Sequence, residues 1–127
     1  MASKSDLTIH LIFVTKYRKP CLTDEIMNFC IEQLRLECER IGSEVIAIRG
    51  DQQNHIHLML KLKPRHSVSN VVQILKQTSR YRVWQRYPTL RKWYWYKDWL
   101  WSDGYFCSTI GNASKETIER YINEQGN

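Results

Sequence analysis

The sequence lacks paired cysteines, a secretion leader and any long apolar run. Its four cysteines stand at positions 21, 30, 38 and 107, with no CxxC pair and no regular disulfide spacing. The N-terminus has no charged-then-apolar leader, and no apolar run approaches the roughly 20 residues that span a bilayer. These absences predict a soluble, cytoplasmic protein with reduced thiols and no membrane contact.

Acidic residues are missing from a long central stretch. Between Gln52 and Lys97 the chain carries many lysines and arginines but no aspartate or glutamate, and the whole chain has a formal net charge of +6. A cationic stretch without interspersed acids is typical of surfaces that bind a polyanion. It predicts nucleic acid as the partner, and the alternative is a basic surface that only keeps the protein soluble.

Internal repeats and low-complexity linkers are absent too, so the 127 residues are predicted to form one domain, 1–127. Periodicity and turn residues predict four strands, at 7–16, 44–50, 54–62 and near 105–111. Helices are expected over 24–41, from Ser67 or Ser69 onward, and from about Ser114 to Gln125. This order predicts an α+β, ferredoxin-like βαββαβ fold with an antiparallel sheet and an additional C-terminal helix.

The run "NHIHLMLKL" at 54–62 places two histidines on one side of a strand. Alternation turns the leucines inward, while His55 and His57 point to the opposite face. Their Cα atoms would lie about 6.6 Å apart, so both imidazoles can reach one metal ion. The same spacing also occurs in ordinary surface histidines, and two histidines leave a metal shell incomplete.

The last predicted helix carries two residues that could complete this site. Tyr121 and Gln125 stand four residues apart and therefore share one helix face. An amphipathic packing contact is the more usual role of a tyrosine at such a position. Residue patterns alone leave its role open.

Four segments together resemble the single-tyrosine HUH transposases of bacterial and archaeal insertion sequences and the related REP-associated tyrosine transposases. They are "HLIFVTKYRKP", "NHIHLML", "SVSNVVQILKQTSRY" and "YFCSTIGNASKETIERYINEQ". The resemblance implies a metal-dependent endonuclease and strand transferase acting on single-stranded DNA that carries hairpins. It implies His55, His57 and Gln125 as ligands of Mg²⁺ or Mn²⁺, and Tyr121 as the nucleophile that forms a 5′-phosphotyrosine.

The resemblance also implies a role for the basic and aromatic residues. Cations would contact phosphates, which sets affinity, and exposed indoles would stack on unpaired bases. The alternative for the aromatics is packing beneath the long connection that precedes the last strand. The residues predicted to bind DNA are Lys16, Arg18, Lys76, Arg80, Arg86, Trp93 and Trp95.

A position just before the histidine pair departs from the family pattern. An acidic residue commonly precedes the pair, whereas this chain has Asn54. What orients His55 is therefore left open by the sequence.

The predicted arrangement of helices bears on assembly. If both middle helices cover one face of the sheet, the face with the histidines stays open for a partner. A homodimer with composite sites is therefore expected, with His55 and His57 from one chain and Tyr121 from the other, as the resemblance also implies. Two other functions are compatible with the motifs: a domesticated relative that processes hairpin repeats, and a noncatalytic nucleic-acid-binding module on the same fold.

Overall fold

The computed structural model of the protein describes residues 6–110, in which strands and helices follow the predicted order. The strands are β1 (Leu7–Val14), β2 (Glu44–Asp51), β3 (His55–Leu62) and β4 (Phe106–Ile110). The helices are α1 (Asp24–Ile41) and α2 (Val68–Arg86), with 3₁₀ turns η2 (Lys16–Arg18) and η3 (Pro88–Lys92). The α+β prediction is confirmed, while the predicted last helix, with Tyr121 and Gln125, lies outside the described residues.

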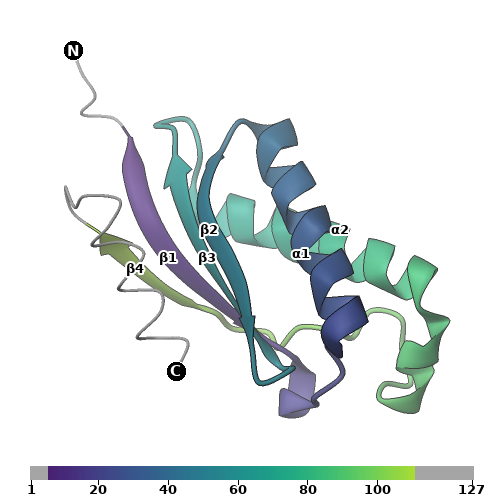
Figure 1. Ribbon diagram of the computed structural model, residues 1–127. Coiled ribbons are helices and arrows are strands. Elements are labelled where there is room, and N and C mark those ends of the chain that lie inside the picture. The colour runs from purple at the N-terminus through teal and green to yellow at the C-terminus, as the bar shows by residue number, and fades with distance from the viewer. Residues whose placement is uncertain (1–5, 111–127) are drawn as a thin grey trace.

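The four strands form one antiparallel sheet in the order β2-β3-β1-β4 (Figure 1). This is the strand order of a ferredoxin-like βαββαβ unit. Strand β3 lies between β2 and β1, and His57 pairs with Arg49 on one side and with Ile12 on the other. The histidine strand is therefore an inner strand, supported by neighbours along both edges.

Both helices cover the same face of the sheet (Figure 1). The inward residues of β3, which are Ile56, Leu58, Leu60 and Leu62, are at most 1% exposed. Cysteines of α1 and valines of α2 pack against them in one core cluster. The alternation predicted for β3 is thus confirmed on its apolar side.

Local signals at the helix ends agree with the structure in most respects. Thr23 occupies the N-cap of α1 but makes no side-chain cap bond. Gly42 ends α1 in the left-handed region with φ 82°, where a side chain would be strained. Of the two serines considered for the start of α2, Ser67 is the N-cap, and its Oγ accepts a hydrogen bond from the Asn70 amide at 3.1 Å.

A buried carboxylate joins the two helices. Glu37 of α1 is 2% exposed and pairs with Arg40, one turn later. From α2, the Arg82 guanidinium lies 3.6 Å from the second oxygen of Glu37. Two cations therefore compensate the one buried acid, which is the condition under which a buried charge is tolerated.

Strand β1 ends two residues earlier than predicted. It stops at Val14, and the chain then forms η2, where Tyr17 and Arg18 have φ values of 60° and 54°. Non-glycine residues rarely adopt such angles, so this turn is held by its surroundings. The Thr15 amide donates to Asn54 O at 3.0 Å, and the Lys16 amide donates to Leu100 O at 2.8 Å.

Neither of the two long helices in residues 6–110 is long and apolar enough to cross a membrane.

Candidate active site

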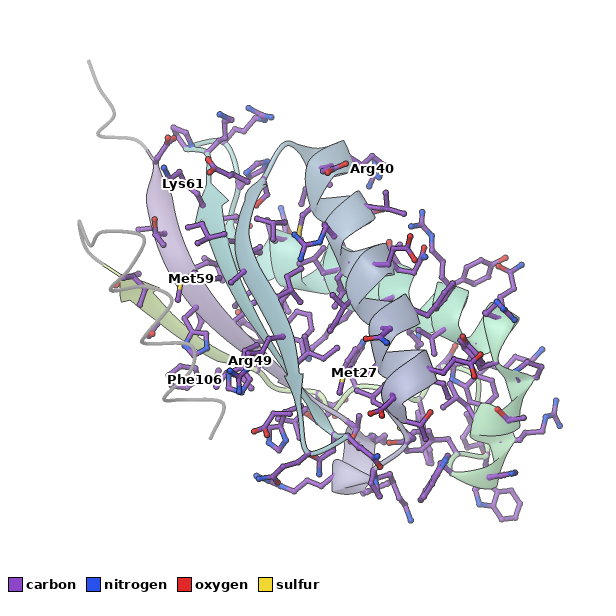
Figure 2. All side chains as sticks on the ribbon, in the orientation of Figure 1. Met27, Arg40, Arg49, Met59, Lys61 and Phe106 are labelled. Carbon is purple, nitrogen blue, oxygen red and sulfur yellow. The ribbon has the colours of Figure 1, made fainter. Side chains whose placement is uncertain are left out.

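The sheet face turned away from the helices carries most of the polar strand residues, and we call it the histidine face. Figure 2 shows Met59 and Phe106 on this side and Met27 on the helical side. Cross-strand pairing brings the side chains of all four strands together there. The residues used below are His10 of β1, Arg49 and Asp51 of β2, His55, His57 and Met59 of β3, and Phe106 of β4.

Side chains at the centre of the histidine face are buried, although neither α1 nor α2 lies on that side. His10 and Met59 are fully buried, and His57 is 2% exposed. The His10 and His57 rings stack with centroids 5.3 Å apart, and Phe106 meets His10 edge-on at 5.8 Å. Side chains on adjacent strands therefore contribute to covering one another, which a reading of one strand at a time cannot reveal.

His55 is oriented by the residue that precedes it. Asn54 Nδ2 donates to Arg18 O at 3.1 Å, which turns its amide oxygen toward the His55 ring. His55 Nδ1 lies 2.5 Å from that oxygen and must donate to it. The ring proton is thereby assigned to Nδ1, and Nε2 keeps its lone pair. Asn54 thus supplies the acceptor expected of an acid at this position.

His57 has a different neighbour at the same ring atom. Its Nδ1 lies 3.1 Å from His10 Nε2. Its Nε2 is buried, and within the described part of the chain it has no hydrogen-bond partner. Asp51 Oδ2 is 4.0 Å from this nitrogen, which is beyond hydrogen-bonding distance.

All three imidazoles are held in their neutral form. Burial is the main cause that lowers the pKa of His10, to about 4, with His57 adding to the effect. Burial also lowers the pKa of His55 and of His57, although Asp51 opposes this for both. Nearby Arg18 lowers the pKa of His55 further. Neutral imidazole is the form that binds a metal.

The histidine pair fits a divalent metal but does not complete a site. His57 Nε2 is buried and has no hydrogen-bond partner in the described residues. His55 Nε2 keeps its lone pair because the ring proton lies on Nδ1. Two such imidazole nitrogens are suitable ligands for a divalent metal. Within residues 6–110, no three His, Cys, Asp or Glu side chains come together as a metal site. The further ligand predicted from sequence, Gln125, lies outside the described residues, as does Tyr121.

Sequence reasoning missed His10 and Asp51. Both lie on strands next to β3, and the register places His10 opposite Met59 and Asp51 opposite His55. The period-two pattern of "IHLIF" does put His10 on one face of β1. Only the strand pairing shows that this is the face shared with His57.

Two of the predicted DNA contacts on α2 also have partners within the protein. Lys76 Nζ donates to Ser102 O and to Gly104 O, each at 2.8 Å, and lies 5.6 Å from the centre of the Phe13 ring. Burial lowers the pKa of this amine. Arg80 Nη1 donates to Lys97 O at 2.9 Å and lies 3.4 Å from an Asp98 oxygen. Both cations hold the segment that leads into β4.

Two other residues predicted to bind DNA have exposed side chains. Arg86 is exposed and lies over the Tyr87 ring, and Trp95 is 92% exposed. Trp93, in contrast, packs against the core. In the segment between α2 and β4, some aromatic side chains therefore pack against the core and others are exposed.

A cluster of cations and aromatic rings surrounds the η2 turn. Tyr17 is 66% exposed and meets Trp99 edge-on, with ring centroids 5.8 Å apart. Lys16 Nζ lies 5.3 Å from the Tyr17 ring and 5.0 Å from the Trp99 ring. Because Arg18 O is hydrogen-bonded to Asn54, this cluster adjoins the histidine pair. It combines the charge and stacking surfaces that single-stranded nucleic acid requires.

Comparison with known proteins agrees with this arrangement. The family model described as "Transposase IS200 like" matches residues 3–125. The ISDra2 transposase TnpA of Deinococcus radiodurans is 31% identical over 119 residues, which cover 94% of this chain and 84% of that protein. The transposase for insertion sequence element IS200 of Salmonella typhimurium is 28% identical over 116 residues, 91% of this chain and 74% of the relative.

Solved structures show the same fold. A Deinococcus radiodurans protein described as a transposase superposes with a TM-score of 0.78 at 30% identity, covering 98% of this chain and 95% of that one. A REP-associated tyrosine transposase bound to a REP hairpin superposes with a TM-score of 0.56 at 15% identity, covering 97% of this chain and 68% of that one. The second likeness concerns the fold alone.

Proposed function

This chain belongs to the family of IS200-like transposases, and on that premise we propose that it cuts and rejoins single-stranded DNA that carries hairpins. Cleavage depends on Mg²⁺ or Mn²⁺ and passes through a 5′-phosphotyrosine. A domesticated relative that processes hairpin repeats would use the same chemistry. A noncatalytic nucleic-acid-binding module is the remaining alternative, and the first experiment below separates it from the other two.

The proposed step needs one nucleophile and one leaving group. The Tyr121 hydroxyl attacks the scissile phosphorus, a new oxygen–phosphorus bond forms, and the bond to the 3′ oxygen breaks. The phenol proton ends on that oxygen as a free 3′-OH. A bound divalent ion would supply charge stabilisation at the phosphate. Because the phosphotyrosine keeps the energy of the broken bond, a second 3′-OH can reverse the step without ATP.

The observation that carries this proposal is the paired orientation of His55 and His57. Both lie on one face of an inner strand, and both rings have a nearby group at Nδ1. Ligands supported in this way bind metal with little reorganisation. In the proposed site Gln125 adds a further oxygen ligand.

The DNA surface proposed here centres on the η2 turn and extends to α2. Lys16 and Arg18 are placed for phosphates beside the histidine pair, and exposed Trp95 for stacking on a base. Arg86, Lys76 and Arg80 add positive charge along α2. For Lys76 and Arg80 this is a second role, because their side chains already bind backbone carbonyls.

The decisive test is covalent capture. Single strands from the flanks of the gene are incubated with the protein and Mn²⁺, and a denaturation-resistant adduct is expected in the wild type. Tyr121→Phe should retain hairpin binding and lose the adduct, because only the phenol oxygen is removed. An adduct in the Phe variant would overturn the assignment of the nucleophile. Hairpin binding that ignores metal, with no adduct in the wild type, would indicate the noncatalytic module.

We further propose that the active site is shared between two subunits of a homodimer. Mixing a His55→Ala/His57→Ala chain with a Tyr121→Phe chain, under conditions that exchange subunits, should restore one working site per heterodimer. Neither parent should cleave alone. If mass spectrometry confirms exchange and the mixture stays inactive, Tyr121 serves the histidines of its own chain.

A further inference from the structure

His10 lies beside the histidine pair, yet nothing in the chemistry proposed above uses it. It belongs to β1, is fully buried, and packs with its ring nearly parallel to His57, at an interplanar angle of 17°. Its Nε2 is 3.1 Å from His57 Nδ1. At this distance the His10 ring can determine which nitrogen of His57 carries the proton.

The contact between His10 Nε2 and His57 Nδ1 allows two arrangements of the ring protons. Two facing lone pairs would repel, and two facing protons would clash, so the nitrogens share one proton. If His10 donates, His57 carries its own proton on Nε2 and cannot bind a metal through that atom. If His57 donates from Nδ1, its Nε2 keeps the lone pair that a metal requires.

Metal binding through His57 Nε2 requires the second arrangement. Within the described residues this buried nitrogen has no hydrogen-bond partner, and the Asp51 carboxylate oxygen is 4.0 Å away. A proton on Nε2 would block metal binding there, whereas a proton on Nδ1 leaves the Nε2 lone pair available. A proton on Nδ1 is satisfied by His10.

We propose that His10 is a positioning residue that accepts the Nδ1 proton of His57 and so presents His57 Nε2 to the metal. The inference rests on the proposed function, because it concerns the same metal site. His10 does for His57 what Asn54 does for His55. The acceptor for His55 is a sequence neighbour, whereas the acceptor for His57 comes from the adjacent strand.

The tautomer of His57 can be measured directly in the metal-free protein. Long-range ¹H–¹⁵N correlation spectra distinguish the two tautomers of a neutral imidazole, and variants assign the signals among the four histidines. In the wild type at slightly alkaline pH, His57 is expected as the Nδ1–H tautomer. Finding His57 with its proton on Nε2 would overturn the proposal, whatever any variant does.

Three variants separate positioning from packing. His10→Leu keeps a similar volume without an acceptor, whereas His10→Gln places an amide oxygen near the position of Nε2. Met59→Leu alters an equally buried neighbour on the same face and serves as the packing control. Far-UV circular dichroism confirms that each variant folds.

The readouts are the His57 tautomer and Mn²⁺ affinity measured by titration calorimetry. His10→Leu should lose the Nδ1–H preference and bind Mn²⁺ about 10–100-fold more weakly, the usual effect of removing a supporting hydrogen bond. His10→Gln and Met59→Leu should stay within about threefold of the wild type. If His10→Leu keeps both the tautomer and the affinity, or if Met59→Leu weakens binding as much, His10 only fills space.

Failure of the proposed function would look different. If His57→Ala leaves Mn²⁺ affinity unchanged, the histidine pair is not a metal site, and positioning by His10 has no ligand to serve. If His57→Ala abolishes binding and His10→Leu does not weaken it, only the positioning proposal is wrong. Should His10→Leu fail to fold, two results still decide. A wild-type His57 with its proton on Nε2, or a His10→Gln affinity well below that of the wild type, would count against His10.

Discussion

Leu58 and His57 are neighbours on β3, yet their side chains lie on opposite faces of the sheet in surroundings that differ in kind. Leu58 is buried among aliphatic residues beneath two helices. His57 is buried beside another imidazole, with a nitrogen that has no partner in residues 6–110. Burial on the helical face stabilises the fold through apolar contact, whereas burial on the histidine face maintains polar groups in a fixed protonation state.

The difference teaches how one strand can serve two purposes. On the helical face a side chain contributes by volume, since packing density decides its value. On the histidine face a side chain contributes by the hydrogen bond at one particular nitrogen. Substitutions on the two faces should therefore change different measured quantities.

The largest effect on stability is expected on the helical face. Leu58→Ala removes buried methyl groups and leaves a cavity, so the free energy of unfolding should fall by about 2–5 kcal/mol. Mn²⁺ affinity of the folded fraction should stay near the wild-type value. Urea titration and calorimetry at low temperature measure the two quantities. A Leu58→Ala protein with full stability and weakened metal binding would contradict the assignment of stability to the helical face and of metal binding to the histidine face.

A somewhat smaller effect is expected for Lys76, whose amine binds carbonyls of the segment leading into β4. Lys76→Met keeps the aliphatic stem and removes the charged donor, so the free energy of unfolding should fall by about 1–3 kcal/mol. Arg86→Ala is the matched control on α2, where an exposed side chain should cost no more than about 0.5 kcal/mol. Both are measured by chemical denaturation.

The same two variants sharpen the proposed DNA surface. In hairpin binding, each cation that contacts a phosphate should lower the slope of log affinity against log salt by roughly 1. Arg86→Ala should change the slope without changing stability. An unchanged slope in Lys76→Met, together with a loss of stability, would assign Lys76 to the fold alone.

Acid should weaken the histidine face before the helical face. The pKa of His10 is about 4 in the folded protein against an ordinary 6.5, so the unfolded chain binds more protons between these values. Stability of the metal-free protein is therefore complete above pH 6.5, declines as the pH falls toward 4, and levels off for this group below that. The decline from His10 should be roughly 1–3 kcal/mol.

Comparison with His10→Gln isolates this contribution from those of the carboxylates. Urea titrations across the same pH range should show a shallower decline in the variant, because the amide does not titrate. Equal slopes in both proteins would mean that folding does not lower the pKa of His10.

The smallest effect is expected at Asn54. Asn54→Ala removes the acceptor at His55 Nδ1 and should weaken Mn²⁺ affinity about 10-fold. Asn54→Asp keeps an acceptor there but loses the donor to Arg18 O, so its affinity should remain within about threefold of the wild type. Calorimetry with both variants tests whether the amide oxygen is what matters. Equal weakening by Ala and Asp would point instead to the bond with Arg18.

Several features of the fold could be predicted because they depend on neighbouring residues. Alternation in "HIHLMLKL" separates the two faces of β3, the apolar spacing of α1 runs until Gly42, and α2 starts after one of the two serines considered. Such patterns reflect the geometry of a strand or helix itself. The histidine pair belongs to this group, since two positions on one strand always share a face.

Other features were predicted incompletely because they depend on where distant segments meet. The sequence predicts DNA contacts for Lys76 and Arg80, whereas the path of residues 97–104 provides backbone carbonyls for both. The end of β1 at Val14 follows from hydrogen bonds of Thr15 and Lys16 to Asn54 and Leu100. Neither partner is near in sequence.

By itself the sequence determined the order of elements over residues 6–110, the family and the orientation of His55 and His57, because periodicity, capping and motif spacing are local properties of the chain. Tertiary structure alone decided that the histidine face is buried at its centre and that His10 meets His57 at hydrogen-bonding distance. The physical reason is register: antiparallel pairing of β1 with β3 joins residues 47 positions apart, and that pairing is specified by the whole sheet.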